Sequence, residues 1–144
     1  MIERQTKSGT MNVEPILIDT SVWIAYFRDR NARLSAEVDE ILSNAEVVVP
    51  KIVLAELIQG AKTDREVAVL EDFLGAFTII DQTKETWIKA GKLSYALKRK
   101  GKTVNLTDCY IAVIANENSC RLMTLDEHFR EIRKALKLDL LEVP

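Results

Sequence analysis

The sequence Ile16-Leu17-Ile18-Asp19-Thr20-Ser21 decides the fold that this chain is expected to adopt. Three branched apolar residues in a row are typical of a short parallel strand that is buried on both faces. Asp19 then lies at the carboxyl end of the strand, which is the edge where open α/β sheets bind ligands. Taken alone, this stretch has a second interpretation, in which Asp19 or Thr20 simply caps the apolar helix predicted over 22–27, because Asp and Thr are both favoured N-caps.

Outward from this stretch, apolar strands alternate with amphipathic helices. Further strands are predicted at 46–49, 77–80, 121–124 and 138–143, and helices at 35–44, 52–60, 63–75, 83–100, 107–118 and 127–137. A continued strand is an alternative at 52–60, and Ser35 and Thr107 are assigned as N-caps. The alternation implies right-handed βαβ units. We therefore predict an α/β three-layer sandwich, with a central parallel sheet of about five strands and helices on both faces.

The length of 144 residues predicts one domain over 13–144, preceded by a flexible polar lead-in over 1–12. Met1 and Met11 are both candidate natural starts. The first residues lack the apolar core of a secretory signal, and no apolar run reaches the roughly 18 residues of a membrane span. Two cysteines without metal-type spacing indicate a reducing, cytoplasmic setting.

The charges restrict the kind of site that is expected. A formal net charge of −2 gives no global attraction to nucleic acid, so any such binding needs a local basic patch. Between residues 84 and 102, seven basic residues stand against one acidic residue, a local charge of +6. This segment is either a solvated helix face or a patch that contacts phosphate, with Lys98, Arg99 and Lys100 as the candidates. The single histidine, His128, excludes a His-rich metal site.

Four acidic residues from distant parts of the chain are expected at one edge of the sheet. Asp19 follows the first strand, Glu56 stands within an apolar helix, Asp108 opens a later helix, and Asp126 follows the fourth strand. Each has an ordinary alternative, such as a solvent-facing Glu56 or an Asp108 favoured by the helix dipole. Carboxylates held close together repel one another unless a cation neutralises them, and Mg²⁺ or Mn²⁺ suits an all-oxygen site. Such ions activate water for hydrolysis of a phosphodiester.

These motifs in this order resemble the PIN domain, and within it the VapC-like toxins of prokaryotic toxin–antitoxin pairs. The resemblance covers the chain from about Ile16 to its end. It rests on Asp19-Thr20-Ser21-Val22-Trp23-Ile24, Ala55-Glu56-Leu57, Thr107-Asp108 before Ile111-Ala112, and Thr124-Leu125-Asp126 before Phe129.

The resemblance implies an endoribonuclease with one or two bound Mg²⁺ or Mn²⁺ ions. By it, Asp19, Glu56, Asp108 and Asp126 are the catalytic and metal-binding residues, while Thr20, Ser21 and Thr124 steady them by hydrogen bonds. Glu127 competes with Asp126 for its role. The resemblance also implies a homodimer and a cognate VapB-like antitoxin whose C-terminal segment fills the active groove.

Three other interpretations are weaker. A haloacid-dehalogenase-type site needs a second acid two residues after the first, where this chain has Ser21. A receiver-type site needs an acidic pair before its phosphorylated aspartate, and no suitable pair is present. A catalytically silent PIN-fold module that binds RNA or an antitoxin is the third, and the presence of all four acids argues against it.

Overall fold

The computed structural model describes residues 14–80 and 82–143, and they form one parallel sheet covered by helices. The predicted lead-in over 1–12 and both candidate starts lie outside the described residues. The strands are β1 (Ile16–Ile18), β2 (Val47–Pro50), β3 (Thr78–Ile80), β4 (Arg121–Met123) and β5 (Asp139–Leu141). The helices are α1 (Thr20–Phe27), α2 (Ala32–Asn44), α3 (Lys51–Gln59), α4 (Asp64–Leu74), α5 (Lys84–Arg99), α6 (Leu106–Glu117) and α7 (His128–Ile132).

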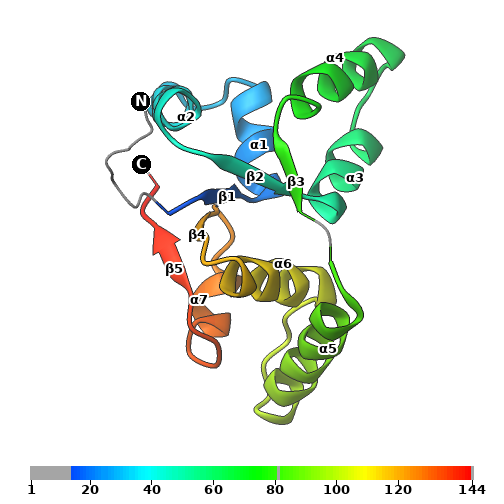
Figure 1. Ribbon diagram of the computed structural model, residues 1–144, viewed down its shortest axis with the longest axis vertical. Helices are drawn as coiled ribbons and strands as arrows, with labels where there is room; N and C mark the ends of the chain where they lie inside the picture. The colour runs from blue at the N-terminus through cyan, green and yellow to red at the C-terminus, as the bar shows by residue number, and fades with distance from the viewer. Residues whose placement is uncertain (1–13, 81, 144) are drawn as a thin grey trace.

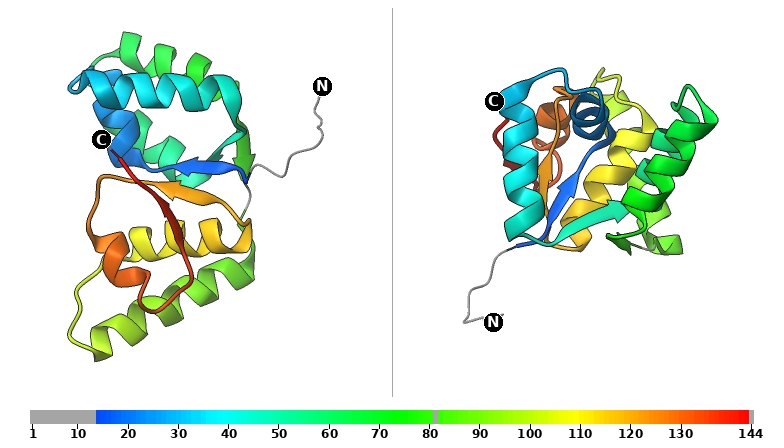
Figure 2. Two further views of the ribbon diagram at one scale, coloured as in Figure 1. Left: turned by 90° about the vertical axis from the view of Figure 1, so that its left-hand side faces the viewer. Right: turned by 90° about the horizontal axis from the view of Figure 1, so that it is seen from above.

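The helices form two layers around the sheet, which confirms the predicted three-layer α/β fold. Helices α1 to α4 lie on one face of the sheet, and α5 to α7 lie on the other (Figures 1 and 2). The segment 51–59 is a helix and not a continued strand. Within the described ranges, no helix is both long enough and apolar enough to cross a membrane.

The strand order is β3-β2-β1-β4-β5, and every neighbouring pair is parallel. The chain builds outward from β1 through β2 to β3, and then crosses back to place β4 on the other side of β1. The order therefore reverses between β1 and β4, and such a switch point leaves a crevice at the carboxyl ends of the two strands. Residues 16–18 are fully enclosed, as expected for a strand that helices cover on both faces.

Two predicted helix starts are wrong, and both errors have the same cause. Helix α2 is capped by Asn31, which accepts hydrogen bonds from the backbone N–H groups of Arg33 and Leu34, and not by Ser35. Helix α6 is capped by Asn105, whose Oδ1 accepts from the Asp108 N–H at 2.8 Å, and not by Thr107. Asparagine is as good a cap as serine or threonine, so residue type alone does not select between neighbouring candidates.

The last helix is shorter than predicted. It ends at Ile132 instead of reaching Lys137, because the following residues tighten into turns with Ala135 N–H and Leu136 N–H donating to the Ile132 carbonyl. The turn brings β5 back beside β4, in the predicted place at the edge of the sheet. Phe129 and Ile132 are completely buried and fasten α7 to the core.

Candidate metal and active site

The carboxyl ends of β1 and β4 bring two predicted site residues to the same crevice. Asp19 directly follows β1, and its backbone N–H donates to the Met123 carbonyl at the end of β4 at 2.9 Å. Asp126 lies three residues beyond that strand end. Although Asp19 occupies the N-cap position of α1, its side chain makes no capping hydrogen bond. Its carboxylate therefore has a different local role.

Two hydroxyl groups hold the Asp19 carboxylate. Ser21 Oγ and Thr124 Oγ1 both donate to Asp19 Oδ2, at 2.9 Å and 2.8 Å. The same hydroxyl oxygens accept from the backbone N–H groups of Leu125 and Asp126, each at 3.0 Å. These bonds tie the loop after β4 to the start of α1. They also fix which way the carboxylate and the backbone of Asp126 face.

Glu56 is held to the same region from a third element. It lies on α3 and is half-buried, and Thr20 Oγ1 donates to its Oε1 at 2.8 Å. Because Thr20 is the residue after Asp19, this bond anchors Glu56 beside the end of β1. The Glu56 side chain thus has a defined partner and does not simply face solvent.

Asp108 is the most unusual acid of the set. It stands in the first turn of α6, is only 7% exposed, and its Oδ2 has no hydrogen-bond partner among the described residues. Burial, and then the nearby charges of Asp126 and Asp19, raise the pKa of the Asp108 carboxyl to about 7. A buried carboxylate oxygen without a donor is costly, so this atom calls for a cation.

Burial acts on the pKa of Asp19 in the same direction. It is only 4% exposed, and burial raises its pKa, against the opposing hydrogen bonds from Thr124 and Ser21. The negative charge of Asp126 raises it further. Like charges in one crevice therefore make the ionised site unfavourable without a counter-ion, and carboxylate oxygens fit a hard divalent cation.

One residue of the site was not predicted. His128 Nδ1 lies 3.1 Å from Asp126 Oδ1 and 3.7 Å from Asp108 Oδ2. These three side chains are the described residues that gather ligand atoms within 4.8 Å of one another. Counting histidines excluded a His-rich site but not a single His contribution. The sequence signal that could have identified His128 is its position two residues after Asp126, at the start of a predicted helix.

Other predicted residues lie outside this cluster. Glu127 is exposed and is the N-cap residue of α7, so Asp126 and not Glu127 faces Asp108 in this structure. Lys98, Arg99 and Lys100 are exposed at the end of α5. Since α5 and α6 pack side by side and the chain reverses between them, this basic end lies at the same end of the helix pair as the start of α6 (Figure 2).

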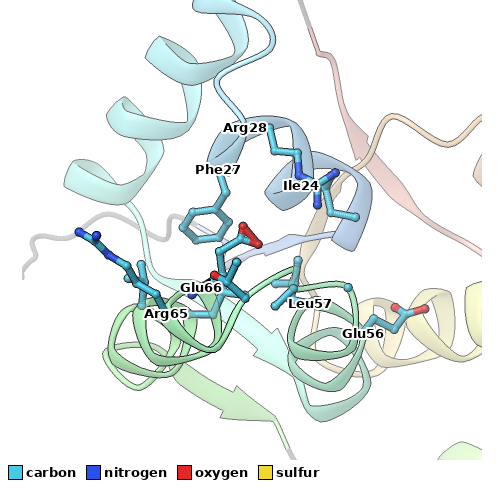
Figure 3. Close-up of a pocket in the computed structure, with 12 residues that line it drawn as sticks. Ile24, Phe27, Arg28, Glu56, Leu57, Arg65 and Glu66 are labelled. Atoms are coloured by element: carbon cyan, nitrogen blue, oxygen red, sulfur yellow. Dashed lines mark hydrogen bonds between the residues drawn. The ribbon is translucent and has the colours of Figure 1, made fainter.

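An apolar groove of about 250 Å³ borders Glu56 on the α1–α4 face of the sheet. Ile24 and Phe27 of α1, Leu57 of α3 and Val69 of α4 line it, and Val69 is exposed. Figure 3 shows Glu56 pointing away from the other labelled side chains of the groove. The groove, which Arg28, Arg65 and Glu66 also line, therefore borders the region that holds Glu56.

Comparisons with known proteins show the family to which the chain belongs. Residues 16–135 match the sequence model of the PIN domain. Ribonuclease VapC11 of Mycobacterium tuberculosis is 30% identical over 127 residues, which cover 85% of this chain and 95% of that protein. Ribonuclease VapC2 of Haemophilus influenzae is 27% identical over 126 residues, covering 85% of this chain and 92% of that protein.

Solved structures show the same fold. The VapBC2 structure from Rickettsia felis, bound to a DNA fragment from its promoter, aligns with a TM-score of 0.74 and 22% identity. The alignment covers 90% of this chain and 99% of that chain. At this identity the likeness supports the α/β architecture.

Proposed function

This chain belongs to the PIN domain family, and from that premise we propose that it is a metal-dependent endoribonuclease of the VapC type. In this role it hydrolyses phosphodiester bonds of RNA and is inhibited by a cognate VapB-like antitoxin. The observation that carries the proposal is the buried Asp108 Oδ2, which has no hydrogen-bond donor among the described residues and faces a crevice shared with Asp126 and Asp19. The 30% identity to a VapC ribonuclease over most of both chains supports the choice of RNA as substrate.

We propose Mg²⁺ or Mn²⁺ as the cofactor, held by Asp108 and Asp126 with Asp19 and Glu56 completing the acidic set. The donor chemistry fits, because all four side chains offer carboxylate oxygens. When bound, a divalent cation would stabilise negative charge on the phosphate and lower the pKa of the attacking water.

The remaining groups of the crevice orient this set. Ser21 and Thr124 hold Asp19 through their hydroxyls, and Thr20 holds Glu56. Pre-oriented carboxylates need no rearrangement when the substrate arrives, which is the usual contribution of such supporting hydrogen bonds. Burial of Asp19 and Asp108 keeps bulk water from screening their charges.

The basic end of α5 is the proposed contact for the RNA backbone. Lys98, Arg99 and Lys100 project from the end of the α5–α6 pair that also carries Asp108. The Arg99 guanidinium lies 5.8 Å from the ring centre of Tyr95, which is 63% exposed. A cation beside an exposed aromatic ring suits a single-stranded segment, since phosphates bind the cation and bases stack on the ring.

We propose that the antitoxin covers the apolar groove next to Glu56 and thereby blocks the crevice. The related structures include VapBC toxin–antitoxin complexes. Apolar side chains of three helices line the groove together with the charged Arg28, Arg65 and Glu66, which suits a partner segment that has an apolar face flanked by charges. We also propose that the protein acts as a homodimer in the cytoplasm, where its two free buried thiols stay reduced.

The decisive experiment is cleavage of a structured RNA by the full chain with Mg²⁺ or Mn²⁺, repeated with EDTA and with Asp19→Asn. Removing one carboxylate charge while keeping the side-chain shape should lower the cleavage rate by about 100-fold or more, because the cation loses a ligand. Asp72→Asn, an exposed acid on α4, is the matched control and should cleave like the wild type.

Equal cleavage by the wild type and Asp19→Asn would refute the assignment of this crevice as the active site. Absence of cleavage for every RNA, together with tight binding to the antitoxin, would instead indicate the catalytically silent binding module.

A further inference from the structure

His128 is placed to contribute more than a surface charge. It is the only histidine of the chain, and it opens α7 on the rim of the acidic crevice. Its Nδ1 faces two carboxylates at once, 3.1 Å from Asp126 Oδ1 and 3.7 Å from Asp108 Oδ2. The imidazole nitrogen and one oxygen from each of the two carboxylates thus form a cluster of three possible metal ligands.

The position of the ring is set by its neighbours. The His128 backbone N–H donates to Asp126 Oδ1 at 2.9 Å, and the Asp126 backbone N–H donates to Thr124 Oγ1 at 3.0 Å. Phe129, the next residue, is completely buried and anchors the helix start in the core. The backbone of His128 is therefore held against the crevice, while its side chain is 54% exposed.

The distances suit adjacent ligands of one ion. Two neighbouring donors of an octahedral ion with bonds of about 2.1 Å lie about 3 Å apart. The separation of 3.1 Å between Nδ1 and Asp126 Oδ1 is close to this value, and the 3.7 Å between Nδ1 and Asp108 Oδ2 is longer by less than 1 Å. The buried Asp108 Oδ2, which has no hydrogen-bond partner within 14–80 and 82–143, is a second observation that points to a cation between these groups.

We infer that His128 donates Nδ1 to the same divalent cation as Asp108 and Asp126, and that this nitrogen makes the site prefer Mn²⁺ over Mg²⁺. The inference rests on the proposed function, because it assumes that the crevice binds a divalent cation. A neutral imidazole with its hydrogen on Nε2 offers the Nδ1 lone pair to the ion. Mg²⁺ favours oxygen ligands, whereas transition-metal ions accept imidazole nitrogen readily.

The test uses the full chain without a histidine tag, so that His128 is the only imidazole present. Pulsed electron paramagnetic resonance of bound Mn²⁺ detects the ¹⁴N coupling of a directly bonded imidazole. We expect this coupling in the wild type and its loss in His128→Ala and His128→Asn. Calorimetric titrations should show Mn²⁺ affinity reduced about tenfold in His128→Ala, with Mg²⁺ affinity changed by about twofold or less.

The matched control is Glu142→Gln, which neutralises an exposed carboxylate that lines a pocket together with Asp126 but does not belong to the three-residue cluster. It should keep both the ¹⁴N coupling and the Mn²⁺-to-Mg²⁺ affinity ratio. Because His128 is exposed, both of its variants should unfold at the wild-type temperature in EDTA.

Two results would overturn the inference: Mn²⁺ bound to the wild type without a ¹⁴N coupling, or an unchanged Mn²⁺-to-Mg²⁺ affinity ratio in His128→Ala. If the wild type cleaves RNA but gives either result, metal coordination by His128 is refuted and the proposed ribonuclease activity is retained. A ¹⁴N coupling in a protein that cleaves no RNA would support the ligand and refute the nuclease.

Discussion

Asp108 is an acid that folding makes harder to ionise. Its pKa rises from an ordinary value of 3.8 to about 7 in the folded chain, chiefly through burial. A group with a raised folded pKa contributes stability below its unfolded pKa and loses that contribution as pH rises through the folded pKa. Between about pH 4 and pH 7, the metal-free protein should therefore lose stability as Asp108 is forced to ionise.

Asp108→Asn should remove this pH dependence. At pH 8 in EDTA, the variant should have a free energy of unfolding about 2 to 4 kcal/mol above that of the wild type, since each pKa unit corresponds to about 1.4 kcal/mol. The difference should nearly vanish at pH 4, where the wild-type carboxyl is neutral. Urea denaturation at the two pH values measures it, and equal stabilities at pH 8 would contradict the assigned cause.

Adding Mn²⁺ at pH 8 should make the wild type more stable than Asp108→Asn. The cation binds the ionised carboxylate only in the folded state, so it raises the stability of the wild type by mass action. The variant, lacking this ligand charge, should gain little. An equal gain in both proteins would place the cation elsewhere.

Thr124 joins two parts of the site through one hydroxyl group. It donates to Asp19 and accepts from the Asp126 backbone N–H, so Thr124→Val removes both bonds while keeping the side-chain shape. We expect RNA cleavage and Mn²⁺ affinity to fall about 10- to 100-fold, the usual effect of losing a group that orients metal ligands. Thr78→Val, at an exposed position of β3, is the control that should leave both quantities unchanged.

At the scale of elements, we expect the basic end of α5 to make RNA binding depend on salt concentration. Lys98→Gln/Arg99→Gln should weaken RNA binding and flatten its salt dependence. Each lost phosphate contact reduces the slope of log affinity against log salt by about 0.7 for a single strand, so the double variant should lose about 1.4. Filter-binding titrations with inactive Asp19→Asn protein provide the measurement.

Arg30→Gln/Arg33→Gln provides the matched control. It removes the same charge from two exposed positions on the opposite helix layer, Arg30 in the connection before α2 and Arg33 in the first turn of α2. Its salt slope should equal that of the parent protein. If both double variants behaved alike, the basic end of α5 would be only a solvated helix face.

At the scale of the whole molecule, α5 presents apolar side chains that the described chain leaves uncovered. Ile88 is 39% exposed in the first half of α5, seven residues before the Tyr95 ring that is proposed to stack on RNA bases. Trp87, 51% exposed, adds to this surface while it stacks on Tyr110 at 3.6 Å. A second copy of the chain is the proposed cover.

Ile88→Lys should therefore shift the protein from dimer to monomer, because a charge buried in an apolar interface lacks a partner. Sedimentation equilibrium measures the change. Val69→Lys, which puts the same charge at an exposed position of α4, should leave the protein dimeric. A wild type that is monomeric at all concentrations would refute the homodimer.

The sequence by itself determined the alternation of strands and helices and the acids that follow strand ends. Period and composition are local properties, so Ile16-Leu17-Ile18 reads as a buried strand without knowledge of its neighbours. The same locality explains the two wrong caps, since Asn31 and Ser35 are equally suitable within one turn of chain.

Only the tertiary structure decided which strand ends lie together and which side chains meet there. The order β3-β2-β1-β4-β5 sets Asp19 beside the loop that carries Thr124 and Asp126, more than a hundred residues away. His128 entered the cluster because the buried Phe129 fixes the start of α7 against the crevice. Such contacts depend on packing between distant segments, and no local pattern encodes the distance between two side chains.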